Sequence, residues 1–321
     1  MSTVPVPFDP EIAVALDGMG EPGPAMTPEE LPEIRRSMTS MFLPPAEVVG
    51  QRPVEIAEYT VPGPSGAPDI ELTVLSPSGL DEPAPALYNM HGGGMMVGHR
   101  YMETGRLVEL VLEHGVVAVN VEYRLAPENP HPAPIEDCYA GLLWTVNHAT
   151  ELRIDPSRVV VMGGSAGGGL AAGLALLARD RGGPALAGQL LLCPMIDDTN
   201  TTVASHQYPG VGPWPREANL AGWAALLGEA AGGNDVSPYA APARARDLSG
   251  LPPAFIEVGS AEGFRDEDTS YALRIWEVGG QAELHVWSGG CHGFDMYAAD
   301  SEISRAALAA RDSWLRRVLR P

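Results

Sequence analysis

The sequence of 321 residues contains no lysine, so arginine supplies all 20 of its Lys and Arg side chains. This absence excludes several chemistries that depend on a lysine amine. A Schiff base to a pyridoxal cofactor, the phosphate clamp of a P-loop and the S-x-x-K nucleophile of serine β-lactamases all require one. None of these sites can be built from this chain.

Cysteine is also scarce. Cys138, Cys193 and Cys291 are too few and too widely spaced to predict a disulfide framework. The sequence has no C-x-x-C or H-E-x-x-H spacing, so no metal site is predicted. A reduced, cytoplasmic setting fits this composition.

Positive charge and long apolar runs are both limited. Asp and Glu number 41, which gives a formal net charge of −21. Such a charge repels phosphate backbones and anionic membranes, so neither nucleic acid nor membrane is expected as a partner. The longest apolar runs, at 170–178 and 186–196, are shorter than a membrane span. Residues 1–10 lack a basic segment followed by an apolar run, so no secretory signal is predicted.

From residue 54 onward, short β-rich runs alternate with longer helical ones, which is typical of βαβ units in a mostly parallel sheet. Eight strands are predicted, at residues 54–60, 70–75, 86–90, 116–123, 158–163, 189–194, 254–259 and 283–287. Helical spacing predicts helices at residues 135–149, 166–179, 266–278 and 301–319. The last helix sets apolar residues against arginines, among them Arg311, as a surface helix would. The fold class is therefore α/β.

Two regions do not follow this alternation. Residues 1–48 and 199–233 are predicted to form a cap over the carboxyl edge of the sheet, where open α/β folds bind ligands. Residues 49–198 and 234–321 would then form the catalytic core of a single domain. Tyr208, Trp214 and Trp223 lie in the second cap segment. They are candidates for the wall of a substrate pocket, and equally for the interior of the cap.

The segment from Gly163 to Gly167 reads G-x-S-x-G and lies between a predicted strand and a predicted helix. Small residues on both sides of Ser165 allow a sharp turn that exposes its hydroxyl at a helix N-terminus. A phosphate-binding turn would need a lysine, or a G-x-G-x-x-G spacing followed by an acidic residue. Neither is present, so Ser165 is predicted to be a nucleophile.

A second glycine-rich segment, His91-Gly92-Gly93-Gly94, directly follows the predicted strand 86–90. Glycines there let backbone N–H groups approach a substrate oxygen without obstruction by side chains. The segment is therefore predicted to supply oxyanion donors, and His91 to be a structural residue.

His292 is the predicted general base. It follows the last strand and is flanked by glycines, whereas His285 lies inside a predicted strand. The others, apart from His91, lie in helices or loops without a chemical partner: His99, His114, His131, His148 and His206. The acid that orients it should lie just after the strand 254–259, which selects Glu262. Asp266 is the alternative acid, although it is better placed to cap the helix that begins there.

These motifs resemble those of the hormone-sensitive-lipase-like branch of the α/β-hydrolase esterases. The match runs from about residue 86 to the end of the core, through segments 91–94, 123–128, 136–140, 163–167, 248–253 and 292–294. The resemblance implies a capped eight-stranded fold that hydrolyses short- to medium-chain acyl esters without a metal or organic cofactor. It also implies that the amides of Gly93, Gly94 and Ala166 form the oxyanion hole.

The chain departs from that family at three places. Gly164 stands where the family usually has an aspartate that helps to brace the turn, and Glu262 stands where it usually has an aspartate. Met95 and Met96 replace a more usual aromatic residue after the glycines, which suggests an adaptable acyl pocket.

The sequence thus predicts a serine carboxylesterase with Ser165, His292 and Glu262 as its triad and a small-molecule ester as its substrate. Amide or lactone hydrolysis by the same residues is an alternative. A non-catalytic receptor for a small molecule is a further alternative that the presence of His292 disfavours. A homodimer is possible.

Overall fold

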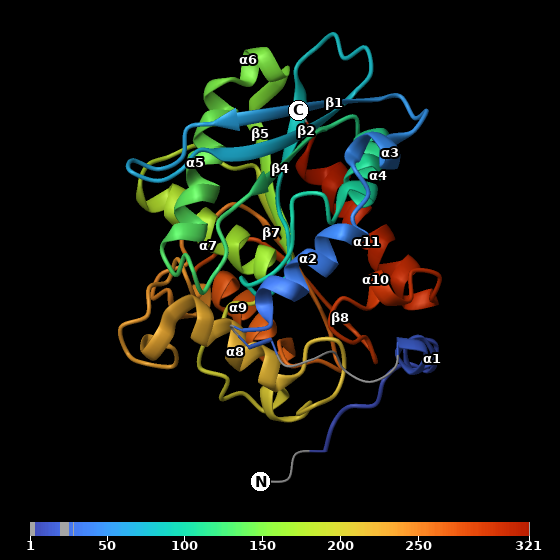
Figure 1. Cartoon of the computed structure of the whole chain (residues 1–321), viewed down its shortest axis with the longest axis vertical. Helices are drawn as coiled ribbons and strands as arrows, with labels where there is room; N and C mark the ends of the chain where they lie inside the picture. The colour runs from blue at the N-terminus through green and yellow to red at the C-terminus, as the bar shows by residue number, and fades with distance from the viewer. Residues whose placement is uncertain (1–3, 20–25, 28, 321) are drawn as a thin grey trace.

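The computed structural model describes residues 4–19, 26–27 and 29–320, and its centre is one eight-stranded sheet (Figure 1). The strand order is β1-β2-β4-β3-β5-β6-β7-β8. The pairs β1/β2 and β2/β4 are antiparallel and the remaining pairs are parallel, which confirms the predicted α/β class and mostly parallel sheet. The strands are β1 (Val54–Val61), β2 (Ile70–Pro77), β3 (Ala84–Met90), β4 (Val117–Glu122), β5 (Ile154–Gly164), β6 (Gly188–Leu192), β7 (Ala254–Gly259) and β8 (Ala282–Trp287).

Helices cover both faces of the sheet. One face packs against α5 (Ala133–Asn147), α7 (Ala166–Asp180) and α9 (Arg265–Glu277). The other packs against α3 (Pro45–Val49), α4 (Thr104–His114) and α11 (Glu302–Val318). Successive residues of a strand point to opposite faces, so Tyr88 lies in the first core and Leu87 in the second. Both faces are apolar because both are buried.

The structure differs from the sequence prediction around α3 and α4. The helix α3 begins within the predicted cap segment 1–48 and ends at Val49, yet it packs against α4 and β1 in the sheet layer. The helix α4 was not among the predicted helices. Two features of the sequence indicate this helix: apolar residues at helical spacing, and a glycine, Gly115, directly after its last turn. Gly115 adopts the left-handed conformation that commonly ends a helix. Two short helices also contact the layers beside the sheet: α6 (Ala149–Leu152) contacts α5, and α10 (Phe294–Tyr297) contacts α11.

The remaining helices pack in two separate groups. Leu31 and Ile34 of α2 (Leu31–Met41) pack with Ala221 of α8 (Arg216–Leu227) and with Met96, just after β3 (Figure 1). The helix α1 (Pro10–Met19) packs against α10. Three short 3₁₀ helices contact longer ones: η1 (Ala204–His206) contacts α9, η2 (Gly228–Ala230) contacts α8 and η3 (Pro242–Arg244) contacts α7. Of the segment 1–48, residues 1–3, 20–25 and 28 lie outside the described residues.

The prediction that α11 presents Arg311 at the surface is wrong. Arg311 is only 3% exposed, and it binds Glu257 of β7 and Asp295 of α10. Burial opposes its charge, but the two carboxylates outweigh burial and raise the pKa of the guanidinium above its usual range. Arg311 therefore holds α10, which begins two residues after His292, against β7.

We expect Arg311→Met to lower the free energy of unfolding by about 3–5 kcal/mol at neutral pH, because Glu257 and Asp295 would lose the cation that compensates them. The deficit should shrink as the pH falls toward 5, since unpaired buried carboxylates take up protons more readily in the folded than in the unfolded chain. Urea unfolding at several pH values measures both effects.

Arg316→Met is the matched control on the same helix. Its partner Glu113 is 43% exposed, so its loss should cost less than about 1 kcal/mol. Equal losses from the two substitutions would contradict a special role for the buried pair.

Candidate active site

Ser165 occupies a strained turn between β5 and α7. Its φ of 56° and ψ of −120° belong to a region that residues with a side chain rarely adopt. Backbone hydrogen bonds hold it there, including one from the Gly169 amide to the Ser165 carbonyl at 3.0 Å. The Ser165 amide donates to the Leu192 carbonyl at 2.8 Å, and its carbonyl accepts from the Met195 amide at 2.9 Å.

Two glycines make this turn possible. A Cβ atom on Gly167 would lie 1.9 Å from the carbonyl oxygen of Met90, and one on Gly163 would lie 2.4 Å from the carbonyl carbon of Gly167. Neither position leaves room for a side chain. The turn, the start of α7 and the end of β3 are therefore in direct backbone contact.

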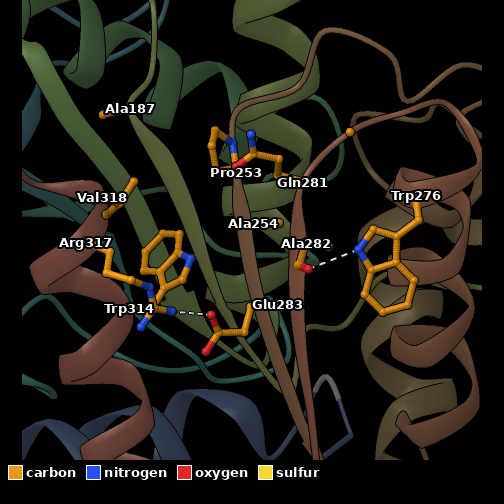
Figure 2. Close-up of a pocket in the computed structure, with 11 residues that line it drawn as sticks. Ala187, Pro253, Ala254, Trp276, Gln281, Ala282, Glu283, Trp314, Arg317 and Val318 are labelled. Atoms are coloured by element: carbon orange, nitrogen blue, oxygen red, sulfur yellow. Dashed lines mark hydrogen bonds and ion pairs between the residues drawn. The ribbon is translucent and has the colours of Figure 1, made fainter.

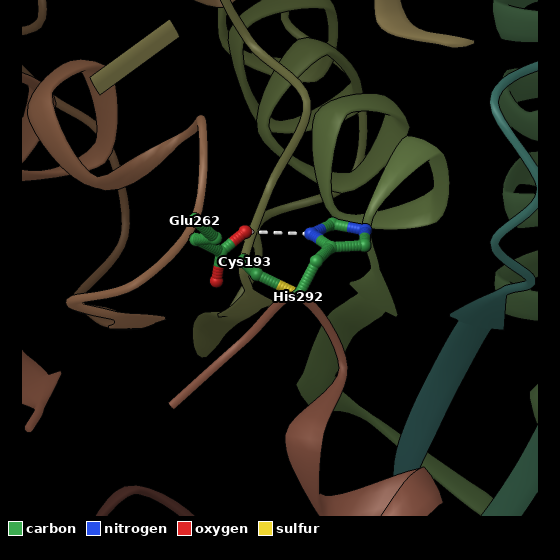
Figure 3. Close-up of side chains that lie close together, drawn as sticks. All are labelled: Cys193, Glu262 and His292. Carbon is green, nitrogen blue, oxygen red and sulfur yellow. Dashed lines mark hydrogen bonds and ion pairs between the residues drawn. The ribbon is translucent and has the colours of Figure 1, made fainter. Parts of the chain in front are cut away.

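The side chain of His292 lies between those of Ser165 and Glu262. The distance from His292 Nε2 to Ser165 Oγ is 2.8 Å, and that from His292 Nδ1 to Glu262 Oε2 is 2.6 Å. Figure 3 shows the contact between Glu262 and His292. Glu262 is buried, and its other carboxylate oxygen accepts the Gly259 amide at 2.9 Å. The chain thus brings together the hydroxyl, imidazole and carboxylate that the sequence singles out.

Asp266, the alternative acid, faces away from this group. Its carboxylate accepts the Ala204 amide of η1 at 2.8 Å and pairs with Arg265. It does not cap the helix either, because α9 begins at Arg265 and Phe264 is the N-cap residue. That expectation is wrong because the helix starts one residue earlier. The Phe264 ring meets the His292 ring edge-on, with centroids 4.9 Å apart.

The glycine loop after β3 lies beside Ser165. A Cβ on Gly92 would lie 3.6 Å from Ser165 Cβ, and both Gly93 and Gly94 have positive φ. Among the described residues, no acceptor is found for the amides of Gly93, Gly94 or Ala166. These amides therefore remain available to a bound oxygen.

His91, at the start of this loop, is buried. Its Nδ1 lies 2.7 Å from the Gly92 carbonyl oxygen, and its ring stacks on Tyr123. Burial lowers the pKa of His91 to about 4, so the ring is neutral at physiological pH. These contacts fit the structural part expected of it.

The residues suggested as substrate contacts lie in different places. Trp214 is partly buried above the glycine loop: its ring blocks the Cβ position of Gly94 at 2.1 Å, and its centroid lies 6.3 Å from that of His292. Met95 and Met96 are each 1% exposed and pack into separate apolar clusters. Trp223 is buried in the main core and Tyr208 in the cap, where its hydroxyl bonds to the backbone of Val6.

Three residues near the site, Asn89, Glu103 and Cys193, were not predicted from the sequence to belong to it. The Asn89 side chain donates to Glu103 Oε2 at 2.9 Å. Burial raises the pKa of Glu103 to about 7, against the effect of hydrogen bonds from Asn89 and from the Gly92 amide. Cys193, after β6, lies beside Glu262 and His292 (Figure 3), and burial raises the pKa of its thiol. Only the tertiary structure brings these residues to the site.

Within the described part of the chain, two groups of side chains have the spacing of metal ligands. One is Cys193, Glu262 and His292; the other is Glu113, His114 and Asp312. In the first, Glu262 and His292 already bind each other. In the second, Asp312 is paired with Arg106 and His114. The contacts within the chain thus account for both groups.

A hollow away from Ser165 lies where β7 and β8 begin, between Trp276 and Trp314 (Figure 2). Ser165 follows the carboxyl end of β5, which is parallel to these strands through β6. The hollow is therefore at the opposite edge of the sheet from Ser165. An ion pair between Arg317 and Glu283 lies in its wall.

Comparison with known proteins agrees with the fold. Residues 87–296 match a family model described as the alpha/beta hydrolase fold. The chain belongs to this family. It falls in the hormone-sensitive-lipase-like branch, as the motifs predict.

Several of its relatives are named as ester hydrolases. Carboxylesterase NlhH of Mycobacterium tuberculosis is 36% identical over 292 residues, which cover 87% of this chain and 88% of NlhH. Esterase LipI of the same species is 33% identical, with 80% and 81% of the two chains covered. The solved structure of a bacterial heroin esterase is 38% identical and covers 98% of both chains with a TM-score of 0.90. This chain is accordingly a carboxylic ester hydrolase.

Among the described residues, no helix has the length and apolar character needed to cross a bilayer.

The packing around the Ser165 turn predicts that Gly167→Ala lowers the free energy of unfolding by about 1–3 kcal/mol, because the added methyl group must push α7 away from β3. Urea unfolding measures the change. Gly105→Ala is the control: Gly105 lies in α4 with no positive φ, and its Cβ would meet no atom closer than 4.0 Å. That change should stabilise the protein by up to about 1 kcal/mol. Shifts of the same sign in the two variants would contradict the packing argument.

Proposed function

We propose that the chain is a serine carboxylesterase in which Ser165 is the nucleophile, His292 the general base and Glu262 the acid that orients the histidine. The observation that carries the proposal is the line of contacts from Ser165 Oγ through His292 to Glu262, at 2.8 and 2.6 Å. Such distances allow a proton to pass from the hydroxyl to the imidazole while the carboxylate fixes the tautomer.

The reaction has two halves. Ser165 Oγ attacks the ester carbonyl carbon and its proton moves to His292 Nε2; the C–O bond of the ester then breaks, and the histidine returns the proton to the leaving alcohol. Water next attacks the acyl-enzyme, giving its proton to His292, and the carboxylic acid leaves as the Ser165 hydroxyl is restored. Glu262 stays ionised throughout and stabilises the imidazolium formed in each half.

The amides of Gly93, Gly94 and Ala166 are proposed to bind the oxyanion of both tetrahedral intermediates. Free N–H groups on a rigid loop suit this part, because they need no reorganisation when negative charge develops on the substrate oxygen. The position of Ser165 at the N-terminus of α7 favours the same charge.

The proposed substrates are esters with short to medium acyl chains. The placement of the Trp214 ring above Gly94 supports a confined site. Amide or lactone hydrolysis uses the same residues and is the second candidate. A non-catalytic receptor is disfavoured by the contact between His292 and Ser165. The cytoplasmic location and the possible homodimer stay predictions.

We expect Ser165→Ala to lower kcat on p-nitrophenyl butyrate by on the order of 10⁶-fold, since Ser165 Oγ is the hydroxyl that contacts His292 Nε2 in the described part of the chain. The wild-type chain should hydrolyse the acetate and butyrate esters faster than the palmitate ester. Initial rates across this series measure both expectations.

A fluorophosphonate probe followed by intact mass is the control for this experiment. The wild-type chain should gain one adduct, and the Ser165→Ala chain with an unchanged melting temperature should gain none. Retained turnover in the variant would refute the assignment of the nucleophile.

Glu262→Gln should lower kcat by on the order of 10³-fold or more, because an amide cannot hold the same tautomer or stabilise the imidazolium. Asp266→Asn is the matched control, since its carboxylate binds the Ala204 amide instead of the histidine. We expect its kcat to stay within a few fold of the wild type. If Asp266→Asn alone removed turnover, the acid would have been assigned to the wrong residue.

A further inference from the structure

One carboxylate between the Ser165 turn and the glycine loop after β3 takes no part in the proposed ester hydrolysis. It belongs to Glu103, which directly precedes α4. Its Oε2 accepts the side-chain amide of Asn89 at 2.9 Å. Asn89 is the last residue but one of β3, from which the glycine loop starts, so Glu103 is bound to the strand that leads into the loop.

The other oxygen of Glu103 faces the serine turn. A Cβ atom on Gly164 would lie 3.9 Å from Glu103 Oε1 and would meet no other atom within 4 Å. On the same side, a Cβ on Gly92 would lie 3.1 Å from the Gly164 carbonyl oxygen. Glu103 thus lies where the glycine loop crosses the residue before the nucleophile.

The surroundings of Glu103 are polar and charged. Asp295 of α10 raises its pKa and Arg311 of α11 lowers it, while Asn89 of β3 contributes a hydrogen bond. Asn89 is itself fixed, because its side-chain amide also donates to Asn120 Oδ1 of β4 at 2.9 Å. The carboxylate is therefore held by rigid strands, as a group that determines the position of a loop needs to be.

We propose that Glu103 is a positioning residue for ester hydrolysis: bound to Asn89 at the end of β3 and lying against Gly164, it fixes the glycine loop relative to the Ser165 turn and so directs the amides of Gly93 and Gly94 toward a substrate oxygen. This inference rests on the proposed oxyanion hole. Among the described residues, the amides of Gly93 and Gly94 have no acceptor, so both are free for the substrate.

The first test compares Glu103→Ala and Glu103→Gln in the full chain. We expect Glu103→Ala to lower kcat on p-nitrophenyl butyrate by about 10- to 100-fold with little change in KM, because misplaced donors weaken binding of the transition state more than that of the substrate. Glu103→Gln, which keeps one acceptor oxygen without the charge, should fall in between. If Glu103→Ala does not fold, as judged by thermal melting, Glu103→Gln decides: a kcat within about twofold of the wild type overturns the proposal.

The second test moves the carboxylate to the other side of the contact. Gly164 has no positive φ, so Gly164→Asp is sterically allowed. With Glu103 present, two carboxylates would face each other, and kcat should fall by about tenfold. In the Glu103→Ala background the same change should raise kcat by at least about fivefold, since the new carboxylate fills the vacated position.

Gly164→Asn in the Glu103→Ala background is the control for size and shape. It should restore less than Gly164→Asp does. Equal recovery by the two, or a loss from Gly164→Asp that does not depend on Glu103, would overturn the proposal. The Ser165→Ala variant separates a failure of this proposal from a failure of the proposed function. If Ser165→Ala is inactive while the Glu103 variants keep full activity, only the positioning role of Glu103 is refuted.

Discussion

The site depends on the close approach of three backbone segments around Ser165. The carbonyl oxygen of Met90 occupies the space that a side chain on Gly167 would need, so the end of β3 and the start of α7 touch directly. This contact forces Ser165 into its strained conformation and exposes its hydroxyl. It also places the glycine loop, which follows Met90, beside the nucleophile. A single packing constraint therefore positions both the attacking group and the proposed oxyanion donors.

Buried charge organises the opposite side of the site. The Glu262 carboxylate accepts the Gly259 amide at the end of β7. Arg311 binds both Glu257 of the same strand and Asp295, which lies three residues after His292. The loop that carries His292 is thus tied to the strand that carries its carboxylate partner. Because an uncompensated charge in this interior would be costly, the pairs tolerate little displacement. The imidazole consequently has a defined position between its two partners.

The cap contributes to the site through Trp214. This ring packs on Gly94 and approaches His292, whereas Tyr208 and Trp223 serve the packing of the cap and the core. Tyr208 and Trp214 lie outside helices and strands, in a segment without a period of 2 or 3.6 residues, so the sequence could not distinguish a wall residue from an interior one there. Trp223 lies in α8, and the packing of that helix places its ring in the core.

The sequence by itself determined the sheet, the family and the three residues that meet at the site, because these depend on local features: buried apolar runs, glycines at strand ends and motif order. It also identified Gly164 as a turn without the usual bracing carboxylate. Only the tertiary structure revealed that Glu103 lies against Gly164, that Arg311 is buried and that Asp266 faces η1. Each of these contacts joins segments that are far apart in the chain. Long-range contacts of charged side chains produce no periodic pattern in the sequence, so they could not be inferred from it.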